Sequence, residues 1–163
     1  MGCVGAWAFM PLTNGDHTLL DSSDYEDLHP GRWYRTKFGY AAWKRKTLIG
    51  VLDDWLHRVI MRLMPWDKME VDHINGDRLD NRRCNLRVVT RAQNCQNKPS
   101  LGGSSKYRGV HWCKRTKRWM ARAKLNQKTY YLGSYEDEED AADAASKFRE
   151  EHMPFSEEGR RAA

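Results

Sequence analysis

The sequence predicts an α+β protein: a strand–loop–strand–helix unit, then a three-stranded antiparallel sheet packed on one helix. Three observations support this fold class. Residues 69–97 hold two short apolar runs around a polar loop with the turn dipeptide Asn75-Gly76. Residues 99–105 form a connection rich in Gly and Ser. Residues 106–152 show three strand-like patterns and then a helical apolar stripe.

The first fifty residues are expected to be rich in β-structure. The turn dipeptide Asn14-Gly15 predicts a hairpin over residues 6–20. The acidic segment 21–28 predicts a short helix capped by Ser22 or Ser23. A second pair of strands is expected at residues 33–36 and 40–43.

An amphipathic helix is predicted over residues 52–63, because apolar residues recur there at helical spacing. Asp53 or Asp54 stands near its start, and Pro65 follows its end. His57 lies off the apolar stripe. We therefore expect this histidine at the surface or in packing, rather than facing a phosphate.

Three polar residues of the strand–loop–strand–helix unit suit one chemistry. Asp72 and His73 end its first strand, and Asn94 lies on the helix after the second strand, so the fold is expected to bring them together. An imidazole can take a proton from water near neutral pH. Carboxylate and amide oxygens are hard ligands that suit Mg²⁺ or Mn²⁺. A base beside such a metal is what phosphodiester hydrolysis needs.

This stretch resembles the HNH endonucleases, also called ββα-metal nucleases, and most closely the phage-type homing enzymes. The resemblance rests on Asp72-His73, Asn75-Gly76-Asp77, Asn85-Leu86-Arg87 and Asn94. It implies that His73 is the general base and that Asn85 braces the loop at the catalytic site. It also implies that Asp72 and Asn94 are the metal ligands. The last motif position is Asn instead of the family's second His, and Asn97 is the alternative ligand.

The positive charge of the chain is concentrated in one segment. The net charge is +6, and residues 99–135 carry nine basic and no acidic residues. Residues 136–163 carry four basic and ten acidic residues. In the strand predicted over residues 118–125, alternation places the basic residues on one face and the small apolar ones on the other. An open basic sheet face is typical of a protein that binds a polyanion.

Residues 106–152 resemble the plant Apetala-two/ethylene-response-factor DNA-binding domain, which is also found fused to phage HNH nucleases. The resemblance rests on the motifs at residues 107–110, 118–123, 131–135 and 139–142. It implies a sheet that lies in the DNA major groove. The residues then expected to contact DNA are Arg108, Lys117, Arg122, Lys124 and Tyr131. His111 and Cys113 stand where the plant proteins usually have Arg, so their site specificity should not transfer. The alternative is a small structural module.

The expected domains follow from these patterns. They are an HNH nuclease domain over 1–98 (a β-rich elaboration over 1–50, then the helix and the ββα-metal motif over 51–98), a linker over 99–105, the DNA-binding domain over 106–152 and a flexible tail over 153–163.

Composition adds several expectations about setting and partners. The four cysteines form no Cys-x-x-Cys pair, so we expect no structural zinc, unpaired thiols and a reducing intracellular setting, bacterial or in a phage-infected cell. No apolar run is long enough to predict a membrane span. No heptad or spare apolar stripe predicts a dimer seam, so we expect a monomer.

The leading hypothesis is a metal-dependent DNA endonuclease of homing or mobile-element type that cuts double-stranded DNA. One alternative is a catalytically inactive, sequence-specific DNA-binding regulator. Another, weaker alternative is a protein that binds or cleaves RNA.

Overall fold

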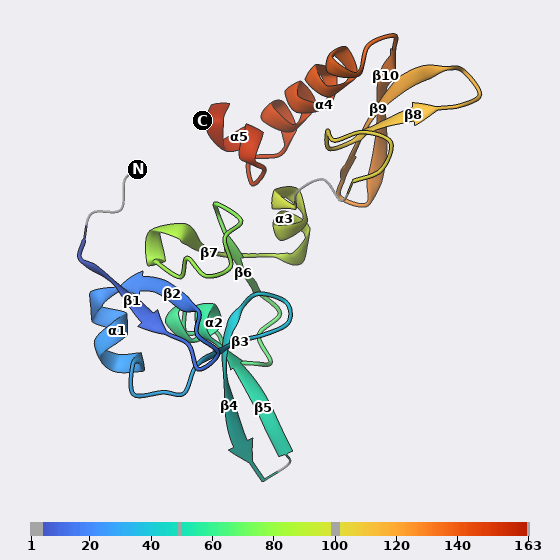
Figure 1. Ribbon diagram of the computed structural model, residues 1–163. Coiled ribbons are helices and arrows are strands. Elements are labelled where there is room, and N and C mark those ends of the chain that lie inside the picture. The colour runs from blue at the N-terminus through green and yellow to red at the C-terminus, as the bar shows by residue number, and fades with distance from the viewer. Residues whose placement is uncertain (1–4, 49, 99–101, 163) are drawn as a thin grey trace. The chain divides into compact units, whose positions relative to one another are not determined.

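The computed structural model describes residues 5–48, 50–98 and 102–162. The chain divides into two compact units, Met1–Arg91 and Ala92–Ala163, whose positions relative to one another are not determined. Small antiparallel sheets and mostly short helices make up the structure, which is therefore of mixed α and β type (Figure 1). Of the predicted linker, residues 99–101 lie outside the described residues.

The first unit begins with the predicted hairpin. Strands β1 (Trp7–Pro11) and β2 (His17–Asp21) pair antiparallel around the Asn14-Gly15 turn, which confirms that expectation. Helix α1 (Ser22–Leu28) follows, but its N-cap is Asp21 and not Ser22 or Ser23. The Asp21 carboxylate instead accepts a hydrogen bond from the backbone N–H of Arg83 at 2.7 Å.

A second sheet corrects the helix predicted over residues 52–63. Strands β3 (Tyr34–Arg35), β4 (Ala41–Thr47) and β5 (Gly50–Trp55) form this sheet, and helix α2 spans only Leu56–Ile60. The apolar spacing suits a helix, but cross-strand contacts outweigh it in residues 50–55 and make them β5. Asp54 pairs with Arg45 of β4 at 2.6 Å, and Asp53 accepts a hydrogen bond from the Tyr34 hydroxyl at 2.8 Å. The β4–β5 hairpin extends away from the rest of the unit (Figure 1).

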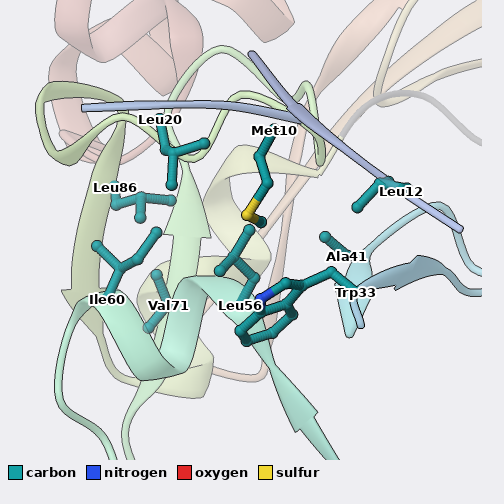
Figure 2. Packing of buried hydrophobic residues seen from close by; sticks show 9 residues of the cluster. All are labelled: Met10, Leu12, Leu20, Trp33, Ala41, Leu56, Ile60, Val71 and Leu86. Carbon is teal, nitrogen blue, oxygen red and sulfur yellow. The ribbon is translucent and has the colours of Figure 1, made fainter. Parts of the chain in front are cut away.

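One apolar cluster holds the elements of the first unit together. It contains Met10, Leu12, Leu20, Trp33, Ala41, Leu56, Ile60, Val71 and Leu86 (Figure 2). The last two come from β6 (Glu70–His73) and β7 (Leu86–Val89), the two predicted strands, which pair antiparallel. A one-turn 3-10 helix, η1 (Arg83–Asn85), leads into β7. Because side chains alternate along a strand, His73 shares the core-facing side with Val71, whereas Asp72 points to the other side.

Helix α3 (Arg91–Asn94) follows β7, as predicted, and lies at the boundary of the two units. It continues into a 3-10 turn, η2 (Cys95–Asn97). The predicted linker ends in folded structure, because Ser105 is buried and its hydroxyl donates to Glu138 at 2.6 Å.

The second unit contains the predicted three strands and helix. Strands β8 (Val110–Cys113), β9 (Arg118–Leu125) and β10 (Lys128–Tyr135) form a sheet in the order β10-β9-β8. Helix α4 (Glu138–His152) covers one face of it through a core of small residues, namely Val110, Ala121, Ala141 and Ala145. Gly109 has a φ of +84°, and a Cβ there would clash with the backbone carbonyl of Arg122.

The flexible tail predicted over residues 153–163 is wrong for the described part. Helix α5 spans Glu157–Ala162, and Met153 and Ser156 are fully buried. Arg149 of α4 pairs with Glu158 at 2.7 Å. These tertiary contacts order a segment that has no apolar periodicity of its own.

Two further expectations concern the cysteines and the membrane. Cys84 is disulfide-bonded, so the prediction of unpaired thiols is wrong for this residue, whereas Cys95 and Cys113 are free. Cys3 lies outside the described residues. No helix within the described ranges has both the length and the hydropathy to cross a membrane.

Candidate active site

The end of β6 positions two of the predicted site residues. In the β6–β7 register, Asp72 stands opposite Arg87 and His73 stands opposite Leu86. Asp72 and His73 are only 6% and 5% exposed, so both polar groups are largely removed from water. Buried polar groups need partners in the protein, and the two residues find them on opposite sides of the hairpin.

His73 of β6 lies in a cluster of rings with His57 of α2 and with Tyr40, which directly precedes β4. Its imidazole is 5.2 Å from the ring of His57 and 5.8 Å from the ring of Tyr40, centroid to centroid. Tyr40 also contacts His57, and the Arg78 guanidinium lies over the Tyr40 ring at 4.9 Å. We refer to Tyr40, His57 and His73 as the histidine cluster.

Burial lowers the pKa of both imidazoles of the histidine cluster. It lowers the pKa of His57 to about 3, and the neighbouring His73 and Arg58 act in the same direction. The pKa of His73 is also lowered by burial, although a hydrogen bond to Asn81 and nearby carboxylates oppose the shift. A neutral imidazole has a lone pair, so His73 can accept a proton near neutral pH.

His57 shows the strength of this desolvation. The residue is 8% exposed, and within the described part of the chain no hydrogen-bond partner lies within reach of its Nδ1 atom. The packing position expected for His57 is therefore observed, but its neighbour is the candidate catalytic histidine and not a remote part of the core.

Asp72 forms an ion pair on the other side of the β-hairpin. Its Oδ2 atom accepts hydrogen bonds from Nε and Nη2 of Arg87 at 2.9 and 2.6 Å. The side chains of Asp72 and Arg87 are 8% and 18% exposed. A charged carboxylate is thus held at the position where the resemblance implies a metal ligand.

Asn85 spans the loop between β6 and β7. Its Oδ1 accepts the backbone N–H of Asn75 at 3.0 Å, and its Nδ2 donates to the carbonyl of Asp80 at 2.7 Å. The Asp80 carboxylate in turn accepts hydrogen bonds from Asn75 and Arg82. Burial alone would raise the pKa of Asp80, but the hydrogen bonds and charge of Arg82 outweigh burial and lower it. The loop is therefore rigidly cross-linked around Asn85.

The two candidate amide ligands lie in the second unit, whose position relative to His73 is not determined. Asn94 ends α3. Asn97 accepts a hydrogen bond from the guanidinium of Arg160 at 2.8 Å, which gives it a structural contact within its own unit. Within the described residues no group of three or more His, Cys, Asp or Glu side chains is placed to hold a metal.

The open face of the second sheet carries three of the predicted DNA contacts. Arg122 and Lys124 alternate along β9 and are exposed, and Tyr131 stands opposite Arg122 on β10 with 59% exposure. Burial lowers the pKa of His111 on the neighbouring strand, and the charge of Arg122 lowers it further. Lys117 is exposed in the turn before β9 with a φ of 50°.

Arg108 is placed differently from the open-face position that its sequence suggests. Its guanidinium donates to the backbone carbonyls of Gln96 at 2.6 Å and Cys95 at 3.2 Å. Burial lowers its pKa, and the nearby charge of Arg149 adds to this. Arg108 thus fixes the turn that follows α3.

Sequence reasoning missed three residues around His73, namely Tyr40, Asn81 and Thr18. Asn81 belongs to the polar loop of the predicted unit, yet it is fully buried and its Oδ1 lies 3.2 Å from His73 Nε2. Thr18 contacts Asn81 from β2, and no local pattern connects positions so far apart in the sequence. The only sequence signal for the burial of Asn81 is the polar composition of the loop, because polar groups of a folded loop need hydrogen-bond partners within the protein.

In this site two antiparallel strands carry a buried imidazole and a buried carboxylate next to a braced polar loop, an arrangement that is compatible with a nuclease. In agreement, residues 54–96 match a family model described as HNH endonuclease. The matched segment includes Asp72, His73, Asn85 and Asn94, but it covers less than half of the chain. Searches of curated proteins and of solved structures found no match. The family match supports a nuclease with nucleic acid as its substrate.

Proposed function

We propose that the protein is a metal-dependent DNA endonuclease of homing or mobile-element type. One observation carries the proposal. His73 is a buried imidazole whose pKa is lowered by burial, and it follows Asp72 in the sequence, within the segment that matches HNH endonucleases. The enzyme acts on double-stranded DNA as a monomer inside a bacterial or phage-infected cell.

In the proposed reaction, His73 takes a proton from a water molecule near the scissile phosphate. The water oxygen forms a bond to phosphorus, the bond to the leaving sugar oxygen breaks, and that oxygen gains a proton from solvent. The charge that develops on the phosphate needs a counter-charge, since buried negative charge is costly in a site of low polarity. Asn85 contributes by keeping the loop next to His73 in one conformation.

The residues fit a hard divalent metal, Mg²⁺ or Mn²⁺. Asp72 supplies a carboxylate, and Asn94 supplies an amide oxygen, with Asn97 as the alternative. Magnesium sites commonly use only one or two carboxylates, with water and phosphate oxygens as further ligands, so a larger acidic cluster is not required. When bound, the metal supplies positive charge for the leaving oxygen.

The second unit is proposed to select the DNA site, as an Apetala-two/ethylene-response-factor-like module. Arg122, Lys124 and Tyr131 form an exposed basic face, and Lys117 extends it at the turn. These groups suit contacts to phosphates and base edges. Arg108 contributes indirectly, because it holds the carbonyls of residues 95 and 96.

Plasmid cleavage tests the proposed activity. Supercoiled DNA is incubated with the protein and Mg²⁺ or Mn²⁺, with and without EDTA, and compared with His73→Ala. Loss of a general base should reduce the cleavage rate by about 10²–10⁴-fold while DNA affinity is retained. His17→Ala is the matched control, because His17 is exposed on β2. Cleavage by His73→Ala at the wild-type rate would exclude His73 as the base.

A second candidate function is an inactive DNA-binding regulator. The observation that favours it is the ion pair of Asp72, whose Oδ2 accepts both hydrogen bonds from Arg87. A regulator would bind DNA with the same salt dependence but would cleave no plasmid with either metal. The same incubation therefore separates the two functions.

A further inference from the structure

A chain of hydrogen bonds connects β2 to the imidazole of His73. Thr18 Oγ1 donates to the carbonyl oxygen of Leu79 at 2.7 Å. Asn81 Nδ2 donates to Thr18 Oγ1 at 2.8 Å, and Asn81 Oδ1 lies 3.2 Å from His73 Nε2. Thr18 and Asn81 are both 0% exposed, so bulk water does not compete for these contacts.

The chemistry of these contacts assigns every proton. Two oxygens 2.7 Å apart need a proton between them, and a carbonyl has none, so the Thr18 hydroxyl must donate to Leu79. Its only proton is then used, and Thr18 must accept from the amide nitrogen of Asn81. The amide oxygen of Asn81 therefore faces His73 and can only accept. His73 must carry its proton on Nε2, and the lone pair is on Nδ1.

We propose that Thr18 and Asn81 are positioning residues that hold His73 in its Nε2–H tautomer and leave Nδ1 as the nitrogen that accepts the proton from water. The catalytic part rests on the proposed function, whereas the tautomer does not. Thr18 lies outside residues 54–96, the segment that matches HNH endonucleases. The N-terminal hairpin is thus part of the site and not an accessory to it.

The backbone allows the Thr18 hydroxyl to be tested by itself. Leu19 N–H donates to the carbonyl of Leu79 at 2.8 Å, and Asn81 N–H donates to the carbonyl of Leu19 at 2.7 Å. These bonds keep β2 and the loop together without the hydroxyl. In Thr18→Val the shape is retained, but the Asn81 amide loses its short hydrogen bond to the hydroxyl and keeps only the long contact of its Nδ2 to the carbonyl of Arg78 at 3.5 Å, so its orientation is held less firmly. The amide can then turn and donate to Nε2, which moves the histidine proton to Nδ1.

Nitrogen-15 NMR of histidine-labelled protein reads the tautomer directly. The His73 ring signals are assigned by their absence in His73→Gln. Wild type should show the Nε2–H pattern, Thr18→Ser should retain it, and Thr18→Val should show a substantial Nδ1–H fraction. Thr47→Val is the control, because the Thr47 hydroxyl donates to the turn carbonyl of Gly50, at 2.8 Å, in the β4–β5 hairpin. A wild-type Nδ1–H tautomer would overturn the proposal without any variant, and so would an unchanged Nε2–H tautomer in Thr18→Val.

Kinetics test the consequence. Thr18→Val should lower kcat by about 10–100-fold, the usual cost of losing a partner that orients a functional histidine, with KM unchanged. Thr18→Ser should restore kcat, which a purely structural role of the side chain would not explain if both variants melt like wild type. Equal kcat in all three proteins would refute the positioning role. If no protein cleaves DNA but the tautomers change as expected, the proposed function fails while the hydrogen-bond chain stands.

Discussion

Replacing Arg87 by Ala should test two roles of Asp72: its stabilising ion pair with Arg87 and its proposed binding of a metal ion. The Asp72–Arg87 pair has hydrogen bonds of 2.6 and 2.9 Å, and removing Arg87 leaves a buried carboxylate without its cation. Breaking a fully buried ion pair costs about 3–5 kcal/mol. Arg87 retains 18% side-chain exposure, so water can replace part of its role, and we expect a loss of about 2–3 kcal/mol of unfolding free energy.

Urea unfolding measures this loss of stability. The same measurement with added Mg²⁺ then tests whether Asp72 binds the metal. If Asp72 is a metal ligand, Mg²⁺ should raise the unfolding free energy of Arg87→Ala by about 1.4 kcal/mol at a concentration ten times the dissociation constant of Mg²⁺ for this variant. The wild type should respond less, because Arg87 competes for the carboxylate. The double variant Asp72→Asn/Arg87→Ala should regain part of the lost stability and lose the response to magnesium, because its buried charge is gone.

Arg45→Ala is the matched control for this experiment. Arg45 pairs with Asp54 at 2.6 Å, but its side chain is 49% exposed on the β4–β5 hairpin. Such a pair contributes about 0–1 kcal/mol. Wild-type stability of Arg87→Ala would refute the reasoning about the buried pair. An equal magnesium response in Arg45→Ala and Arg87→Ala would refute the competition between Arg87 and the metal, and an equal response in Arg87→Ala and Asp72→Asn/Arg87→Ala would refute Asp72 as the ligand.

Three more predictions follow from the histidine cluster, the basic sheet and the number of active sites. Because the folded pKa of His57 is about 3, below its unfolded value near 6.5, the unfolded chain binds the extra proton between these values. The contribution of His57 to the unfolding free energy should therefore be fully present above pH 6.5 and fall by about 1.4 kcal/mol per pH unit as the pH drops below this value. In urea titrations, the unfolding free energy of His57→Gln should depend less steeply on pH than that of the wild type. Arg122→Ala and Lys124→Ala should each reduce the log–log salt slope of DNA binding by about one unit per lost phosphate contact; unchanged slopes would exclude these residues as contacts. One Asp72–His73 pair per chain predicts a nick, so open-circle plasmid should precede linear plasmid, whereas simultaneous linear product with a steep dependence on protein concentration would indicate a dimer.

Local patterns predicted the elements whose signals are local. The Asn14-Gly15 turn and the alternation in β9 need no distant information, and both predictions are confirmed. The errors lie where distant contacts decide. Residues 50–55 pair with β4 although their spacing also suits a helix, and α5 depends on the ion pair between Arg149 and Glu158.

The candidate site divides in the same way. Asp72, His73 and Asn85 could be proposed from one contiguous motif, because the loop between β6 and β7 carries them. Tyr40 contacts His73 directly, and Thr18 of β2 is connected to it through Asn81. Both residues lie far earlier in the chain, and no spacing rule predicts such contacts. The position of Asn94 relative to His73 stays a prediction from the motif, since the two residues belong to different units.

Burial explains why the matched segment depends on residues that precede it. Asn81 and Thr18 are fully buried, and Asp80 is 4% exposed, so each polar atom there needs a partner within the protein. A buried amide left without an acceptor costs about 1–3 kcal/mol, a large part of the stability of a domain this small. Residues 54–96 alone would leave the Asn81 amide without the Thr18 hydroxyl and the Asp80 loop without the backbone of Leu19. The polar loop next to the candidate base therefore requires the N-terminal hairpin for its structure, and the proposed hydrogen-bond chain would make the same hairpin orient His73.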